Sequence, residues 1–182
     1  MAPKETPQTP VATANPFTAA DVVAILGERG WLAAPPSPEQ IAWCERAASL
    51  LGAHAADRSA VADLLHLVFH YDASELMARV ETHVTLSRYA ARDVLRRLAL
   101  LVLEGAPLTS ERFQQIVRGL KEDLDLRGRE LFHPIRLALA GRAGEGELDR
   151  VILLLDEAAV LPFGVAVKPA RQRILEFCAA LD

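Results

Sequence analysis

The 182-residue sequence contains little cysteine and has no long uninterrupted apolar segment. Its two cysteines, Cys44 and Cys178, lie far apart in the chain, which is typical of reduced thiols in a cytoplasmic protein rather than of a disulfide framework. The uncharged segment 158–167 contains Pro162 and Gly164 and is too short to cross a bilayer. No apolar stretch near the N-terminus marks a secretory signal. We therefore expect a cytoplasmic protein without a membrane partner.

The sequence also lacks the short motifs that bind nucleotides, metals or catalytic nucleophiles. None of the patterns GxGxxG, GxxxxGK[ST], HExxH, paired CxxC or GxSxG occurs. His66 and His70 are four residues apart on a predicted helix, but no further side chain at a suitable spacing completes a metal shell. We interpret them as packing or surface residues. The sequence thus predicts neither an enzyme nor a bound cofactor or metal.

Apolar residues make up 51% of the chain, which excludes general disorder. The formal net charge of −4 is unevenly distributed. Residues 1–87 hold five basic and ten acidic side chains, whereas residues 88–150 hold twelve basic and ten acidic ones. Cations predominate only in this middle segment, which is a weak indication of an anionic partner, because a dedicated nucleic-acid-binding domain is usually far more basic.

The periodicity of apolar residues predicts an all-α fold. Apolar side chains recur at spacings of three and four, and no alternating strand pattern or hairpin dipeptide is present. In the segment 87–103, this periodicity places Tyr89 on the apolar face. Start and stop signals predict helices at about 18–28, 37–52, 59–69, 72–84, 87–103, 110–120, 129–140, 147–156 and 170–181.

The predicted fold is a bundle of about eight or nine helices in two packed subdomains. Residues 1–15 contain three prolines and few large apolar side chains, so we expect a flexible tail with order beginning near Phe17. A Gly-Ala-Pro break within 104–108 separates an N-terminal helical subdomain, residues 16–105, from a C-terminal one, residues 106–182.

A stripe of arginines lies within the predicted helix 87–103. Arg88, Arg92 and Arg96 are spaced by four, which places three guanidinium groups on one face. Like charges at this spacing destabilise a helix by about 0.2–0.5 kcal/mol per pair. The stripe either binds phosphates or forms a solvated face whose acidic partners come from a neighbouring helix. We favour the solvated face and retain the three arginines as candidate RNA-binding residues.

The most informative segment is residues 120–141. It predicts a helix end, a tight turn at Gly128 and a second helix that Pro134 interrupts and Gly141 ends. Arg136 follows an apolar residue and is predicted to emerge at the edge of the apolar face. This combination of a glycine turn, a proline and one arginine on a short helix is unusual for plain core packing.

This segment resembles a known family. The run Arg127-Gly128-Arg129-x-Leu131-Phe132-x-Pro134-Ile135-Arg136-x-Ala138-Leu139-x-Gly141 is similar to the signature of the C-terminal anticodon-binding domain of bacterial glutamyl-tRNA synthetases. Weaker similarity covers residues 57–72 and 171–181. The chain departs from the family at Ala140, where threonine is usual, and at residues 145–148. It also lacks the catalytic region with its ATP motifs.

The resemblance implies a non-catalytic module that binds tRNA or a tRNA-like RNA. It places Arg136 at the anticodon, where a planar fork of donors can bond a base edge or stack on it. Arg127, Arg129 and Lys121, around the turn, would hold phosphates. A purely structural role for Arg136, as the cap of the C-terminus of a neighbouring helix in a fold that has lost its ligand, stays open.

Two other functions remain as alternatives. The acidic segment 1–87 and the apolar segment 158–167 are also compatible with a helical protein-interaction module that has lost RNA binding. A third interpretation is a trans-acting appendix to a separate synthetase catalytic chain. The initiator methionine and the proline-rich segment after it are typical of a complete small protein, with an expression fragment as the alternative.

Overall fold

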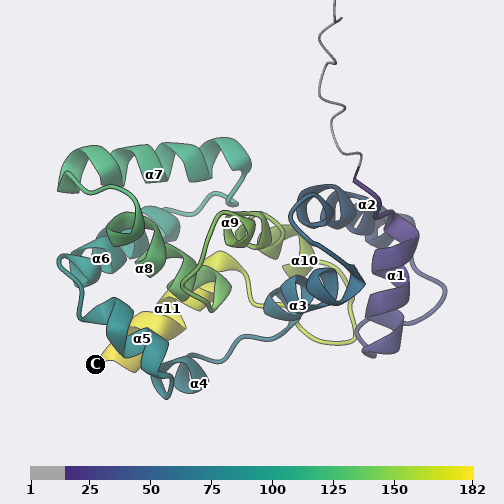
Figure 1. Cartoon of the computed structure of the whole chain (residues 1–182). Coiled ribbons are helices and arrows are strands. Elements are labelled where there is room, and N and C mark those ends of the chain that lie inside the picture. The colour runs from purple at the N-terminus through teal and green to yellow at the C-terminus, as the bar shows by residue number, and fades with distance from the viewer. Residues whose placement is uncertain (1–14) are drawn as a thin grey trace, which may run out of the picture.

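The computed structural model describes residues 15–182, and all regular structure in this range is helical (Figure 1). The predicted all-α fold is therefore confirmed. The predicted flexible tail lies outside the described residues, except for Asn15. The helices are α1 (Ala19–Glu28), α2 (Pro38–Gly52), α3 (Arg58–Phe69), α4 (Ala73–Met77), α5 (Val80–Leu86), α6 (Ala91–Leu103), α7 (Ser110–Leu124), α8 (Arg129–Ala140), α9 (Glu147–Ile152), α10 (Leu155–Ala159) and α11 (Ala170–Leu181).

Local capping signals set the start of the early helices. At α2, Ser37 and Gln40 form the predicted capping box, in which each side chain satisfies the backbone N–H of the other residue. The helix α3 begins earlier than predicted, because Asp57, rather than Ser59, is its N-cap and accepts from the N–H of Ala60 at 2.8 Å.

Two of the predicted helices are each divided, which raises the number of helices in residues 15–182 above the predicted eight or nine. The segment 72–84 forms α4 and α5, because the backbone of Arg79 is extended between them. The guanidinium of Arg79 donates to the carbonyl of Gly141 at 3.2 Å, a tertiary contact that no local pattern indicates. The segment 147–156 is divided between α9 and α10.

The start of α6 differs from the prediction. The helix begins at Ala91 because Ala90 has a left-handed backbone, with φ of 59°, which interrupts any helical path from residue 87. Tyr89 consequently lies outside the helix and is 78% exposed, so its predicted place on the apolar face is wrong. In α8, by contrast, the helix continues on both sides of Pro134, so the interruption predicted there is wrong. The proline removes its own backbone donor but does not end the helix.

One continuous hydrophobic core joins the early and late helices. The helices α2 and α3 contact α9, and α6 contacts both α8 and α11. The apolar segment 158–167 largely covers this core: the ring of Phe163 packs edge-on against Trp43 and Phe69, at centroid distances of 5.2 and 5.1 Å. Two large apolar side chains of this segment are exposed, Val160 at 83% and Val165 at 41%. The division into two subdomains stays a prediction.

The chain enters this fold beside the end of α2. The side-chain amide of Asn15 donates to the carbonyl of Ala48 at 2.8 Å, and its carbonyl accepts from the N–H of Phe17 at 3.0 Å. A side chain at Gly52 would collide with Asn15. These contacts hold Asn15 against the end of α2.

A fully buried arginine holds three helices together. The guanidinium of Arg173, on α11, donates to the carbonyls of Leu67 and Val68 at the end of α3, at 2.9 and 2.8 Å. It also donates to the carbonyl of Leu139 near the end of α8, at 3.0 Å. Burial lowers the pKa of Arg173 to about 10. The acceptors are helix C-terminal carbonyls, which carry partial negative charge.

Both cysteines are free, as predicted, with Cys44 buried on α2 and Cys178 half-buried on α11. Burial raises the pKa of both thiols, to about 11 for Cys44. No helix within residues 15–182 is long and apolar enough to traverse a bilayer.

Candidate nucleic-acid interface

The sequence-predicted cations come from three segments that meet at one end of the molecule. The start of α6, the end of α7 and the start of α8 lie together on the left of Figure 1. Arg97 on α6 forms an ion pair with Asp123 on α7 at 3.4 Å, and Arg88 bonds His133 on α8 at 3.1 Å. We refer to this surface as the basic end, formed by Arg88, Arg92, Arg96, Lys121, Arg127 and Arg129.

Most cations of the basic end are exposed and unpaired within residues 15–182. Arg92, Lys121, Arg127 and Arg129 have no hydrogen bond or ion pair there, and Arg96 has only a loose contact of 3.8 Å with Asp93. Such exposed pairs contribute little to stability, so the charges stay available for phosphates. Acidic side chains share this surface and moderate its charge, namely Asp93, Glu122, Asp123, Asp125 and Glu130.

Only two of the three arginines in the predicted stripe lie on α6. Arg88 precedes α6 and is held against α8, whereas Arg92 and Arg96 lie on the exposed side of α6. The acidic partner from a neighbouring helix that we expected belongs to Arg97 instead. Phosphate binding by the stripe stays a prediction.

A glycine turn places Arg127 and Arg129 on either side of the α8 start. Gly128 has φ of 57° and ψ of −137°, a conformation that glycine adopts without steric cost. Its carbonyl accepts from the N–H groups of Leu131 and Phe132, which begins the helix. The preceding Leu126 is buried and anchors the turn. The backbone of the turn thus places two exposed arginines next to each other at the start of α8.

Arg136 has a different environment from the rest of the predicted site. It is only 8% exposed, and its Nε and Nη2 donate to the two carboxylate oxygens of Asp149 at 2.9 and 3.0 Å. Its Nη1 donates to the carbonyl of Gly144 at 2.7 Å, and its guanidinium carbon lies 4.6 Å from the ring centroid of Phe132. Base readout by Arg136 stays a prediction, and it would require Asp149 to release the guanidinium. This geometry favours a structural role, although the partners are the Gly144 carbonyl and Asp149 in the first turn of α9, rather than the C-terminal carbonyls of a helix.

His133 links the basic end to the Arg136 region and carries no sequence signal of this role. Its Nδ1 accepts from Nη1 of Arg88, because an arginine is always a donor, and the imidazole in this contact is therefore neutral. Burial lowers the pKa of His133, and the charges of Arg88, Arg129 and Arg136 lower it further, whereas Glu145 raises it.

This shift predicts a pH dependence of stability. The unfolded chain, whose histidine has its ordinary pKa near 6.5, takes up a proton before the folded chain does, so stability falls as the pH drops below about 6.5. We expect His133→Gln, whose amide oxygen can still accept from Arg88, to show a smaller loss of thermal midpoint between pH 7 and pH 5 than the wild type. His54→Gln on an exposed loop is the control; an unaltered pH profile for His133→Gln would contradict the assignment.

His66 on α3 and His70, the C-cap of this helix, form a surface cluster. The rings of His66 and His70 stack with centroids 5.1 Å apart, and Nε2 of His70 lies 2.8 Å from Oε2 of Glu75. Within residues 15–182, no group of three or more His, Cys, Asp or Glu side chains is arranged to hold a metal ion.

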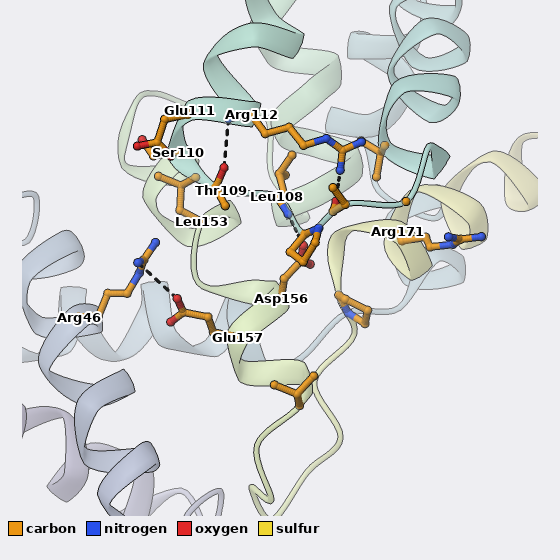
Figure 2. A pocket seen from close by; sticks show the side chains of 16 residues that line it. Arg46, Leu108, Thr109, Ser110, Glu111, Arg112, Leu153, Asp156, Glu157 and Arg171 are labelled. Carbon is orange, nitrogen blue, oxygen red and sulfur yellow. Dashed lines mark hydrogen bonds and ion pairs between the residues drawn. The ribbon is translucent and has the colours of Figure 1, made fainter.

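A groove of about 590 Å³ lies away from the basic end. Figure 2 shows its position between the α6–α7 connection, α10 and the start of α11. Two of its three carboxylates already have partners: Asp156 accepts from the N–H groups of Leu108 and Ala170 at 2.6 and 3.0 Å, and Glu157 pairs with Arg46 at 3.3 Å. These contacts fasten the starts of α7 and α11 to α10.

Similarity to known proteins identifies the class to which this helical chain belongs. The family model described as "Anticodon binding domain" matches residues 12–161, and the chain belongs to this family. As the residue pattern predicted, its relatives are glutamate–tRNA ligases, and the similarity supports an anticodon-binding domain of this kind.

The relatives are much longer proteins. The chain is 31% identical over 148 residues to the glutamate–tRNA ligase of Desulforudis audaxviator, covering 77% of this chain and 28% of the relative. It is 33% identical over 89 residues to glutamate–tRNA ligase 2 of Syntrophus aciditrophicus, covering 49% and 16%. For the Geobacillus thermodenitrificans enzyme the identity is 27% over 136 residues, covering 75% and 27%. The chain thus spans about a quarter or less of these relatives, and no solved structure matches it.

Proposed function

We propose that this chain is a non-catalytic module that binds tRNA or a tRNA-like RNA through the basic end. The observation that carries the proposal is the Gly128 turn, which fixes Arg127 and Arg129 in exposed positions without an internal partner in residues 15–182. Membership of the anticodon-binding family supports the same class of ligand. A cytoplasmic location belongs to this proposal.

The roles of the cations differ in the proposed complex. Arg127, Arg129 and Lys121 contact phosphates around the turn, and Arg92 and Arg96 extend the same surface along α6. Arg88 contributes through its contact with His133, which fixes the start of α6 against α8. Arg136 fixes the 141–149 segment, and base readout by its guanidinium is the finer prediction that experiment must decide.

Salt-dependent binding of total tRNA tests the proposal. We expect Arg129→Ala to weaken all RNAs about equally, and to make the loss of affinity between 50 and 200 mM salt about threefold smaller, because one phosphate contact and its counterion release are lost. Arg127→Ala should behave in the same way. Arg171→Ala, an exposed arginine beside the groove of Figure 2, is the matched control.

Binding no tighter than about millimolar at low salt would contradict the RNA-binding proposal. The chain would then be better explained as a helical protein-interaction module, with a separate synthetase catalytic chain as one partner to test. The observation that favours this second function is the internal engagement of Arg136 by Asp149 and Gly144.

A further inference from the structure

Tyr89 is the one exposed side chain among the phenylalanines, tryptophans and tyrosines of residues 15–182. It is 78% exposed, whereas every other phenylalanine, tryptophan and tyrosine of residues 15–182 is buried or half-buried. It is also located within the basic end, directly after Arg88 and three residues before Arg92. A single exposed aromatic residue on a protein surface is ordinary, but its placement among cations that lack internal partners is specific.

The backbone around Tyr89 holds it outside the helix. Ala90 adopts a left-handed conformation, with φ of 59° and ψ of 7°, which costs an alanine roughly 1–2 kcal/mol. The N–H of Ala91 closes the turn on the carbonyl of Arg88 at 3.3 Å. On the other side of the turn, the bond from Arg88 to His133 fixes the segment against α8. A fixed turn therefore presents the ring, rather than a mobile loop.

An exposed ring beside cations has the chemistry of a stacking platform for unpaired bases. Every nucleobase has a π-face that can stack on tyrosine, and the neighbouring arginines can hold the flanking phosphates. Paired bases are not accessible in this way, because their faces are covered within the helix. We infer that Tyr89 stacks on an unpaired base of a single-stranded RNA segment bound at the basic end. This inference rests on the proposed RNA-binding function and adds Tyr89 as a residue that contacts a base.

The test compares single-stranded and paired probes. Binding is measured for total tRNA, for an unpaired ten-nucleotide RNA and for a blunt duplex of the same sequence. Tyr89→Ala should weaken the first two about 5- to 150-fold, which corresponds to about 1–3 kcal/mol per stacked base, and should leave duplex binding unchanged. Tyr89→Phe should bind like the wild type, since stacking does not need the hydroxyl. Val160→Ala, an equally exposed apolar residue outside the basic end, is the control.

A second readout reports the stacking directly. In Tyr89→Trp, the new indole should be quenched by the unpaired RNA, whereas Trp31 and Trp43 of the wild type, which are half-buried and buried, should change little. Two outcomes would overturn the stacking role alone. In the first, Tyr89→Ala loses the same affinity for paired and for unpaired RNA. In the second, Tyr89→Ala binds RNA like the wild type, although Arg129→Ala still weakens binding. A wild type that binds none of the probes would overturn both this inference and the proposed function.

Discussion

Replacing Arg173 with leucine is expected to lower the free energy of unfolding by about 3–5 kcal/mol. The substitution leaves the carbonyls of Leu67, Val68 and Leu139 without donors in a buried site, and each unsatisfied group costs about 1–3 kcal/mol. For a chain of this size, the thermal midpoint should fall by about 6–20 °C. Thermal denaturation followed by circular dichroism measures this loss.

Arg173→Lys and Arg171→Ala make the test specific. The ammonium of lysine keeps the charge but cannot reproduce the planar fork that reaches both α3 and α8. The thermal midpoint of Arg173→Lys should therefore lie between those of Arg173→Leu and the wild type. Arg171 is exposed on the same helix, and its replacement should change stability by less than about 0.5 kcal/mol. A thermal midpoint of Arg173→Leu within about 2 °C of the wild type would show that the buried network contributes little.

The second large effect is expected at Arg136. Arg136→Ala leaves the partly buried carboxylate of Asp149 without its bidentate partner, and removing one member of such a pair typically costs about 3–5 kcal/mol. In a double-mutant cycle with Asp149→Ala, the coupling free energy should be about 1.5–3 kcal/mol.

RNA binding by the same variant separates the two interpretations of Arg136. If the guanidinium is structural, Arg136→Ala should lower the thermal midpoint and, at a temperature where it remains folded, bind different anticodon sequences in the same order as the wild type. If it reads a base, affinity for the preferred RNA should fall by about 1–3 kcal/mol and discrimination should flatten. A native midpoint together with flattened discrimination would rule out the structural interpretation.

Features that depend on neighbouring residues could be predicted from the sequence. The capping box at Ser37 and Gln40 and the helix end at Gly141, with φ of 85°, follow from local chemistry, and the structure confirms both. The division between α4 and α5 could not be predicted, because it accompanies the bond from Arg79 to Gly141, 62 residues away in the chain. Tyr89 was misplaced because periodicity assumes a continuous helix, which Ala90 interrupts.

The partners of the two buried arginines, Arg173 and Arg136, could not be predicted from the sequence either. The acceptors of Arg173 on α3 lie about a hundred residues earlier in the chain, and a lone arginine in an amphipathic segment carries no sign of them. The turn at Gly128 was predicted because glycine between two cations is a local signal, but the pairing of Arg136 with Asp149 depends on how the 141–149 segment folds back.

The contact of Asn15 with Ala48 has a practical consequence for where a label can be attached to the protein. The chain enters beside α2, at the end of the molecule opposite the starts of α6 and α8, whereas the C-terminus lies beside α5 (Figure 1). A biotin or fluorophore attached ahead of Asn15 would leave the basic end facing the solution on a sensor surface. The same label at the C-terminus would bring the sensor surface close to the basic end and hinder the access of RNA. Immobilisation through the two termini should therefore give different apparent affinities for large RNAs, and the N-terminal attachment is the one to choose.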